Sequence, residues 1–353
     1  MTLRYGVIGT GNMGQEHIRN LGAVDGVEVT AVADTDAGMR QKAAALTGLT
    51  AYPDYRDMLG AEALDALVIA SPNHTHRSIL ADAVATDLPI IVEKPLCSTV
   101  EDCQAVIAAA SSRAAPVWVA MEYRFMPPVT RLIEEVRKGT VGQLRMLAIR
   151  EHRFPFLDKV GAWNRLSALS GGTMVEKCCH FFDLMRLITN SDPIRLYATG
   201  GQDVNHLDET VDGQAADVVD NAFVAVDFAN GTRAMLDLCM FAEASRDQEE
   251  ITVTGDGGKV ECGIPSSRLS IGKRGFVNRM GDILPMSTEH IPVDEKLLQL
   301  GDHHGATYFE HVAFRDMIRT GGKPAVTLDD GLWAVAMGQA AERSIREHTA
   351  VAL

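Results

Sequence analysis

An acid, an amine and a proline end a short apolar stretch in the first third of the chain. The stretch Ile90-Ile91-Val92 lies between Pro89 and Pro95 and runs directly into Glu93 and Lys94. Apolar runs of this length are typical of strands buried on both faces of a parallel sheet. Ligands bind at the carboxyl edge of such sheets, so Lys94 is predicted to lie beside a bound ligand. A surface lysine paired with Glu93 in a tight turn is the alternative.

A second set of candidate acid/base groups follows the glycine pair Gly171-Gly172. If this segment is helical, Glu176 and His180 are one turn apart and Asp183 lies another turn on, so the three share one stripe. Imidazole exchanges protons near neutral pH, so a histidine between two acids is a candidate general base. A solvent-exposed Glu-His-Asp stripe is the alternative, and it is the more common meaning of this segment taken alone.

A glycine-rich turn near the N-terminus is the first element that could hold a ligand. Gly9, Gly11 and Gly14 form a G-x-G-x-x-G spacing between an apolar strand and a helix predicted over residues 12–21. In this motif the first glycine permits the turn, the second lets the backbone approach a diphosphate, and the third lets helix and strand pack closely. The diphosphate lies at the helix N-terminus. The cofactor contacts predicted beside these glycines are Asn12 and Met13.

The second predicted strand, residues 27–33, ends in Asp34, which lies twenty residues beyond Gly14. A carboxylate at this position of the motif accepts hydrogen bonds from a ribose diol. It would also repel the additional phosphate of NADP, and neither Thr35 nor Asp36 is an arginine that could bind that phosphate. NAD is therefore the predicted cofactor.

The next predicted strand, residues 65–71, leads into a loop, Pro72-Asn73-His74-Thr75-His76, and a helix to about residue 85. Asn73 is a candidate N-cap, which suits a loop at the carboxyl edge of the sheet. His74 and His76 have the spacing of a metal-binding pair, but no motif supplies the third protein ligand that a catalytic zinc needs. We therefore predict no metal here. The remaining predicted cofactor contacts are Ser71, Asn73, His76, Glu93 and Lys94.

Strands and helices alternate up to a last apolar strand at residues 116–121, which predicts a Rossmann domain over residues 1–121 with a doubly wound, mostly parallel sheet. Residues 122–353 are predicted to form an α+β domain for substrate binding and oligomerisation, with a largely antiparallel open sheet. The strands expected there are residues 143–152, 218–228, 232–241 and 248–254. The expected helices start at Thr99 (as N-cap), Pro127, Ala306 and Leu328, the last one after Thr327 as N-cap.

Three motifs together carry a resemblance to a known family. The G-x-G-x-x-G turn, Glu93-Lys94-Pro95 and the Gly-Gly-x(7)-His-x-x-Asp segment resemble, in order and spacing, the Gfo/Idh/MocA oxidoreductases, which include inositol 2-dehydrogenases. The resemblance implies that Lys94 and His180 are catalytic. The family's active-site aspartate falls on Glu176, a departure that prevents transfer of any one member's substrate. The predicted substrate contacts are Lys94, Arg124, Trp163, Glu176, Lys177, His180, His304 and Tyr308.

The resemblance implies the reversible oxidation of a secondary alcohol on a sugar, polyol or inositol by NAD. His180 would remove the hydroxyl proton, Lys94 would stabilise the developing alkoxide, and Glu176 would bind a neighbouring hydroxyl or tune the basicity of His180. One alternative is an NAD-dependent enzyme that cleaves glycosides through transient oxidation of the sugar. Another is a non-catalytic NAD or sugar sensor, which has no need for both Lys94 and His180. For His304, local partners at a helix start are an equal alternative.

Length and composition limit the remaining possibilities. A chain of 353 residues favours two domains, and its formal net charge of −14 disfavours nucleic acid and anionic membranes as partners. The first strand begins by Arg4, which leaves no room for a signal peptide, and no apolar run reaches the ~20 residues of a membrane helix. The six cysteines lack CxxC spacing, so reduced thiols and a cytoplasmic location are predicted.

The predicted antiparallel sheet carries a final expectation about assembly. A sheet of this size with one exposed face needs cover. The relatives that the motifs resemble bury this face between subunits, so a homodimer or homotetramer is expected.

Overall fold

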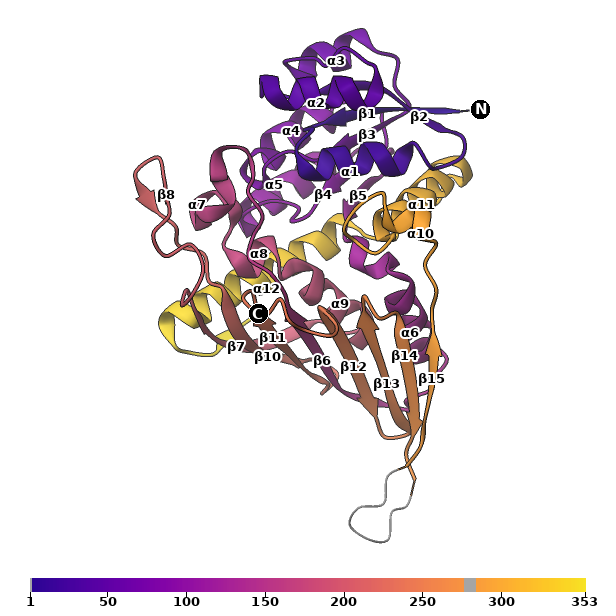
Figure 1. Cartoon of the computed structure of the whole chain (residues 1–353), viewed down its shortest axis with the longest axis vertical. Coiled ribbons are helices and arrows are strands. Elements are labelled where there is room, and N and C mark those ends of the chain that lie inside the picture. Colours follow the sequence, from indigo (N-terminus) through magenta and orange to yellow (C-terminus); the bar gives the residue numbers. More distant parts are fainter. Residues whose placement is uncertain (1, 276–283) are drawn as a thin grey trace.

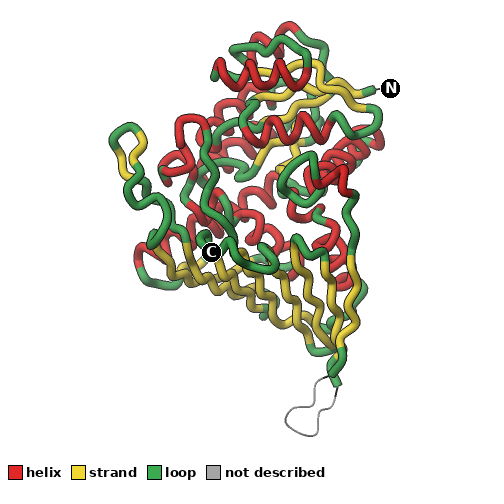
Figure 2. Tube along the Cα trace, in the orientation of Figure 1, coloured by secondary structure: helices red, strands yellow, loops and turns green. Residues whose placement is uncertain are grey.

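Two sheets with helices between them make up the body of the protein (Figure 1). The computed structural model describes residues 2–275 and 284–353. The first part of the chain builds the smaller sheet and the second part builds the larger one (Figure 1). The strands of both sheets are drawn in yellow in Figure 2. Helices of the second part lie between the sheets and contact both. Within the described ranges, no helix combines the length and the apolar character needed to cross a membrane.

The smaller sheet has the strand order β2-β1-β3-β4-β5, and all of its strand pairs are parallel. Its strands are β1 (Leu3–Ile8), β2 (Val27–Ala33), β3 (Ala66–Ile69), β4 (Ile90–Glu93) and β5 (Val117–Ala120). Every residue of β3, β4 and β5 is buried, as expected for strands covered on both faces. The predicted doubly wound sheet is confirmed, and its carboxyl edge gathers the ends of β1, β3 and β4.

The connecting helices are α1 (Asn12–Leu21), α2 (Ala37–Thr47), α3 (Tyr55–Ala61), α4 (His76–Ala83) and α5 (Val100–Ala110). Thr99 caps α5 as predicted, because its hydroxyl accepts a hydrogen bond from the amide of Asp102. The predicted cap at Asn73 is wrong. A 3₁₀ turn, η1 (Asn73–Thr75), precedes α4, and the side-chain amide of Asn73 donates to the carbonyl of Ser170 at 3.0 Å instead.

In the described residues, the larger sheet has the strand order β15-β14-β13-β12-β6-β11-β10-β7-β16. Its strands are β6 (Leu144–His152), β7 (Pro193–Gly201), β10 (Asn221–Phe228), β11 (Arg233–Cys239), β12 (Glu249–Gly255), β13 (Gly258–Ile264), β14 (Arg268–Lys273), β15 (Met286–His290) and β16 (Val351–Ala352). β6 and β11 run parallel, whereas the other pairs are antiparallel. The four predicted strands match β6, β10, β11 and β12. A short hairpin, β8 (Thr210–Val211) and β9 (Gln214–Ala215), is separate.

Helices lie on one face of the larger sheet, among them α6 (Pro127–Arg137), α9 (Cys179–Thr189) and α12 (Leu328–Glu347) (Figure 1). Alternate strand residues point into this helical layer and are buried. The residues between them point the other way, where neighbouring strands expose Met146, Tyr197, Phe223 and Met235. We call this surface the open sheet face; Phe223, one of its apolar side chains, is 59% exposed.

The last helices of the chain join the two parts. α11 (Ala306–Thr320) packs against α1, and α12 packs against α5 and β5. Phe314 of α11 and Val335 of α12 are buried in the same apolar cluster as Val119 of β5. Thr327 caps α12 in a reciprocal capping box with Asp330, as the predicted N-cap requires. The core beneath the smaller sheet is therefore completed by residues from the end of the chain.

Candidate active site

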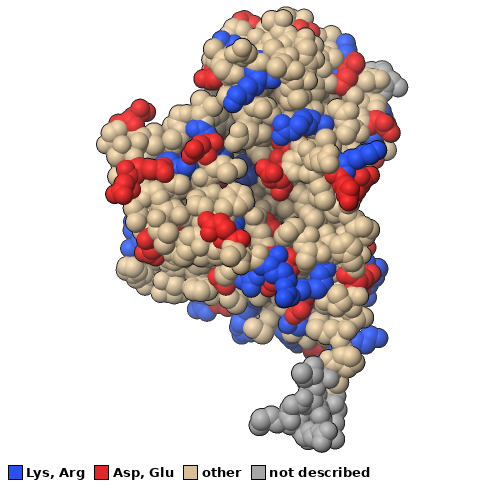
Figure 3. Space-filling view, in the orientation of Figure 1, with Lys and Arg blue, Asp and Glu red and all other residues tan. Residues whose placement is uncertain are grey.

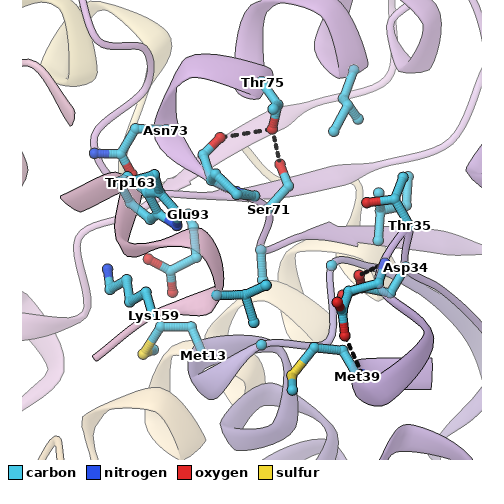
Figure 4. A pocket seen from close by; sticks show the side chains of 18 of the residues that line it. Met13, Asp34, Thr35, Met39, Ser71, Asn73, Thr75, Glu93, Lys159 and Trp163 are labelled. Atoms are coloured by element: carbon cyan, nitrogen blue, oxygen red, sulfur yellow. Dashed lines mark hydrogen bonds between the residues drawn. The ribbon is translucent and has the colours of Figure 1, made fainter. Parts of the chain in front are cut away.

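A cavity of about 700 Å3 opens at the carboxyl edge of the smaller sheet (Figure 4). Its wall combines the β1–α1 turn, the loop after β3 and the end of β4 with residues 158–161 and 163 from the second part of the chain. We call it the edge cavity. The predicted cofactor contacts that line it are Gly9, Gly11, Asn12, Met13, Asp34, Ser71, Asn73, Glu93 and Lys94. Two others, Gly14 and His76, lie outside the lining.

The glycine turn is shaped by close backbone contacts. Gly9 has φ +87°, and a Cβ on it would lie 2.6 Å from the carbonyl oxygen of Ala70. A Cβ on Gly14 would lie 2.0 Å from the carbonyl oxygen of Gly9, so Gly14 serves helix–strand packing rather than the wall. Nothing lies within 4 Å of a Cβ built on Gly11. The turn therefore leaves room for a ligand at the N-terminus of α1, where backbone N–H groups favour a diphosphate.

Asp34 closes the other end of the edge cavity. Its Oδ2 accepts hydrogen bonds from the amide of Thr10 at 2.6 Å and from the Thr10 hydroxyl at 3.1 Å, which hold the carboxylate in the wall. Lys42 of α2 and Arg56 of α3 also line the cavity. No motif indicated these two cations, because they lie on helices that the sequence pattern did not reveal.

The two histidines after β3 have different surroundings. His76 is fully buried, with its ring nitrogens 2.9 Å from the carbonyl oxygens of Pro95 and Ser71, so it braces the loops that follow β3 and β4. Its predicted role as a direct cofactor contact is replaced by this bracing role. His74 lines the cavity and meets Trp163 edge-on, with ring centroids 6.2 Å apart. Across the described ranges, no three His, Cys, Asp or Glu side chains are grouped to hold a metal ion.

Lys94 stands where the edge cavity meets the second part of the chain. Its ammonium donates to the backbone carbonyl of Glu176 at 3.0 Å. Burial lowers the pKa of Lys94, but the surrounding acids, Glu176 foremost, outweigh burial and raise it. The amine is therefore held as a cation at the carboxyl end of β4.

A break in the helix sets the position of that carbonyl. Glu176 ends α8 (Thr173–Glu176), whereas His180 and Asp183 belong to α9. The predicted single helical stripe is therefore wrong. Because the chain turns between the two helices, the Glu176 carbonyl is free to accept from Lys94. Asp183 instead pairs with Arg124 and lies in the helical layer.

Glu176 is held as an anion by a residue that no motif indicated. Its Oε1 accepts a hydrogen bond from the ammonium of Lys159 at 2.9 Å. Burial raises the pKa of Glu176, but Lys159, Lys94 and other cations outweigh burial and lower it to about 2. The Lys159 ammonium also lies 4.4 Å from the centroid of the Trp163 ring, and both side chains line the edge cavity (Figure 4).

His180 is sealed inside the protein next to this site. Its ring stacks on Tyr123 at 4.2 Å, and its Nε2 lies 3.4 Å from Oε1 of Glu122. Its Nδ1 is buried and has no hydrogen-bond partner in the described residues. Burial, followed by the charges of Lys94 and Lys177, lowers the pKa of His180 well below its ordinary value. The imidazole is therefore neutral and keeps a lone pair.

Four predicted substrate contacts are engaged by local partners. The Arg124 guanidinium binds Asp183 and the Ala325 carbonyl. Lys177 donates to the Tyr123 hydroxyl at 2.6 Å and lies 2.8 Å from Glu151, beside the Tyr123 ring on which His180 stacks. His304 Nε2 lies 2.7 Å from Ser267 Oγ, and Tyr308 meets Phe309 edge-on.

The neighbouring histidine, His303, faces buried acids instead: its Nε2 lies 3.5 Å from Glu122. Glu122 follows the end of β5 by two residues. The carboxyl-edge argument that selected Lys94 could therefore also have selected Glu122.

Family comparisons agree with this architecture. The model described as "Oxidoreductase family, NAD-binding Rossmann fold" matches residues 3–121, and "Oxidoreductase family, C-terminal alpha/beta domain" matches residues 133–353. The chain belongs to the Gfo/Idh/MocA oxidoreductase family, whose NAD-binding domain forms its first part.

Individual relatives and structures extend the likeness over the whole chain. The Myo-inositol 2-dehydrogenase of Thermotoga maritima is 26% identical over 99% of this chain and 98% of its own length. The Rhizopine catabolism protein MocA of Rhizobium meliloti is 32% identical, and that match spans 54% of this chain and 58% of the relative. A solved levoglucosan dehydrogenase, in complex with NADH and levoglucosan, superposes with a TM-score of 0.86 at 20% identity, covering 100% of this chain and 99% of that chain.

Proposed function

We propose that this protein oxidises a secondary alcohol of a sugar, polyol or inositol with NAD. The observation that carries the proposal is the convergence of a cationic amine, Lys94, which lines the edge cavity, and a buried neutral imidazole, His180, whose pKa the charge of Lys94 helps to lower. The printed names of relatives and neighbouring structures, among them a myo-inositol 2-dehydrogenase and a levoglucosan dehydrogenase, support this substrate class.

The residues of the edge cavity fit a dinucleotide. The open position above Gly11 admits a diphosphate, and Asp34 is held where it can accept hydrogen bonds from a ribose. When bound, NAD supplies the hydride acceptor for the reaction. The chain's own residues must orient the alcohol, take its proton and keep water away.

Each candidate residue then has a separate task. The imidazole of His180 accepts the hydroxyl proton, since neither of its ring nitrogens makes a hydrogen bond within the described residues. The ammonium of Lys94 stabilises the developing alkoxide, and the carbonyl of Glu176 aims that ammonium. The carboxylate of Glu176, ionised and paired with Lys159, is suited to bind a neighbouring hydroxyl rather than to remove a proton.

A dehydrogenase screen tests the proposal. Inositols, polyols and free sugars are offered with NAD, NADH absorbance is followed, and His180→Ala is measured in parallel. We expect net NADH from at least one compound and its loss in the variant. Cleavage of a glycoside without net NADH would favour transient oxidation, whereas NAD binding without any turnover would favour a sensor.

The surface supports a small-molecule ligand. Basic and acidic side chains are interspersed on the face drawn in Figure 3, and the formal net charge is −14.

The six cysteines are all free, which supports the cytoplasm as the location.

We further propose that two copies of the chain bury the open sheet face in a homodimer or homotetramer. Its exposed apolar side chains motivate this proposal. Light scattering at micromolar concentration is expected to give an oligomer, and Phe223→Glu is expected to dissociate it. A fully active wild-type monomer would contradict the proposal.

A further inference from the structure

Two buried histidines support one of the acids in the wall of the edge cavity. Nε2 of His17 lies 2.8 Å from Oε1 of Glu93, and Nδ1 of His17 lies 2.8 Å from Nε2 of His311. The two imidazole rings meet edge-on, with centroids 5.0 Å apart. His17 belongs to α1 and His311 to α11, so helices from opposite ends of the chain meet at the end of β4.

Glu93 connects this histidine pair to the cavity. It ends β4 and lines the edge cavity, and its Oε2 accepts from the Lys94 amide at 3.1 Å (Figure 4). An ionised carboxylate has about four acceptor sites, so Glu93 can bind a ligand while these contacts hold it. Burial raises the pKa of Glu93, but the hydrogen bond from His17 and the nearby cations outweigh burial and lower it. The carboxyl is therefore an anion in the cavity wall.

The hydrogen-bond pattern places one proton on each ring. Because a carboxylate can only accept, His17 must donate to Glu93 through Nε2–H. Nδ1 of His17 then either accepts from Nε2–H of His311 or donates to it. Nδ1 of His311 is buried and has no partner within the described residues, and buried N–H groups without an acceptor are rare. This favours an unprotonated Nδ1 on His311, so both rings are Nε2–H tautomers.

The strand order places Glu93 and Asp34 on opposite sides of the glycine turn. In the order β2-β1-β3-β4-β5, the turn follows β1, Asp34 follows β2 on one side, and Glu93 ends β4 on the other. A dinucleotide with its diphosphate at the turn and one ribose at Asp34 directs its other half toward β4. That half carries the nicotinamide ring, which is positively charged in NAD and neutral in NADH.

We propose that His17, braced by His311, holds Glu93 as an anion beside the nicotinamide half of the cofactor, and that this charge favours NAD over NADH. The anion attracts the positively charged ring of NAD and gains no such attraction from the neutral ring of NADH. Neither histidine lines the cavity, so both are positioning residues that act through Glu93. This role requires only that the cavity binds NAD, and it is independent of the alcohol and of the base.

Other charges lie near Glu93 but do not depend on His17. The ammonium of Lys94 opposes the attraction between Glu93 and the ring of NAD, and it is present in every variant compared below. The charged and titratable groups that face Glu93 or the two histidines from the surrounding elements are Tyr5, His76, Lys94, Glu122, His303 and Glu310.

Cofactor binding to the purified enzyme, without any alcohol, tests this role. Calorimetry gives Kd for NAD and for NADH, and the ratio of the first to the second is compared between variants. Glu93→Gln is expected to raise the ratio on the order of 10-fold, because the anion is removed. His17→Leu should raise it in the same direction, whereas His17→Gln, whose amide can donate to Glu93, should stay within about threefold of wild type. An unchanged ratio in Glu93→Gln overturns the proposal.

Two comparisons test whether the effect of His17 passes through Glu93. Ile18→Ala removes apolar contacts of the same helix, so it should lower stability and leave the ratio unchanged. Adding His17→Leu to Glu93→Gln should raise the ratio no further, because the charge is already gone. If Ile18→Ala matches His17→Leu, or if His17→Leu adds its full effect to Glu93→Gln, the positioning role is overturned.

The pH dependence of the ratio is a readout that a merely structural role would not move. In His17→Leu burial is less opposed, so the pKa of Glu93 should rise. The ratio should then exceed that of wild type near pH 6 and approach it near pH 9, where the carboxyl ionises again. Dividing by the wild-type ratio at each pH removes the contributions of other groups that titrate. A relative ratio that does not change with pH in His17→Leu contradicts the role of His17.

Histidine side-chain ¹⁵N NMR of the wild type decides the matter if His17→Leu does not fold. An Nε2–H tautomer of His17 supports the positioning role, whereas an Nδ1–H tautomer overturns it, since that ring cannot donate to Glu93. Because none of these measurements needs turnover, the two proposals fail separately. Inactivity toward every alcohol leaves the role of His17 in place, and unchanged binding ratios leave the proposed dehydrogenase in place.

Discussion

The edge cavity adjoins, near Lys94, a row of ionisable groups made of His180, Glu122, His303 and Glu16. Different interactions hold the cavity and the row in place. In the cavity, close backbone contacts of Gly9 shape the turn in the wall, and backbone and hydroxyl groups hold Asp34. Behind His180, side chains from four separated segments meet, and buried charges dominate. The cavity is mainly a product of local chain geometry, whereas the row exists only after both parts of the chain have packed.

This difference separates binding from chemistry. The carboxyl groups around His180 differ in pKa. Nearby cations outweigh burial and lower the pKa of Glu176 to about 2, whereas burial raises the pKa of Glu122 to about 7. Two carboxyls with different protonation can serve as an anion and a proton acceptor in one site. Mutations in the row should therefore change turnover, and mutations in the cavity should change cofactor affinity.

The largest effect is expected for His180. His180→Ala should lower turnover on the order of 100-fold or more and remove the acid limb of the oxidation profile. Glu176→Gln should keep that limb but move it to lower pH, because loss of a nearby negative charge disfavours imidazolium. Initial rates from pH 5 to 9 measure both. Should Glu176→Gln erase the limb while His180→Ala retains it, Glu176 is the base.

Lys94 lines the edge cavity and its charge acts on His180, so its substitution tests both regions. Lys94→Met should lower kcat on the order of 100-fold, since an electrostatic stabiliser of the alkoxide is lost, while NAD affinity changes little. Lys138→Met, at an exposed position directly after α6, is the control and should leave both unchanged. Stopped-flow turnover and NAD titration measure the two quantities; near-normal turnover would assign Lys94 a structural role.

Lys159 should have a smaller and pH-dependent effect. Burial raises the pKa of Glu176, and Lys159 is the foremost group that opposes this rise. In Lys159→Ala the pKa of Glu176 should rise, so the carboxylate is lost as pH falls. We expect several-fold slower turnover near pH 6 and nearly normal turnover near pH 8. An equal loss at both pH values would mean that Lys159 acts by another route.

Asp34 should give the smallest effect on turnover and a clear one on cofactor choice. Asp34→Ala should weaken NAD binding by about 3- to 10-fold, as expected for lost ribose hydrogen bonds. The affinity for NADP should rise, because Lys42 and Arg56 remain in the cavity wall while the carboxylate that opposes the extra phosphate is gone. Dissociation constants for both cofactors measure the change. A wild-type enzyme more efficient with NADP than with NAD would refute the ribose assignment.

Local chemistry alone was enough to predict the cavity. The G-x-G-x-x-G spacing predicted the turn, because glycine readily adopts the positive φ of Gly9 and only glycine tolerates the contact of Gly14 with the Gly9 carbonyl. The alternation of apolar runs predicted the parallel sheet, and its carboxyl edge predicted where Lys94 would lie. Asp34 followed from the same spacing. Each of these features depends on residues that are close in sequence or on the regular geometry of one sheet.

Tertiary packing decided which of the remaining polar residues reach the site. The side chains of Arg124 and His304 have polar groups that could bind a substrate, but Arg124 is paired with Asp183 and His304 with Ser267. Lys159, Glu122 and His303 enter the site through contacts between segments far apart in the chain. The sequence determined the cofactor turn, the sheet and the position of Lys94, because short-range sterics and strand geometry set them. The partners of His180 depended on burial, since the strength and direction of electrostatic interactions are set only when packing removes water.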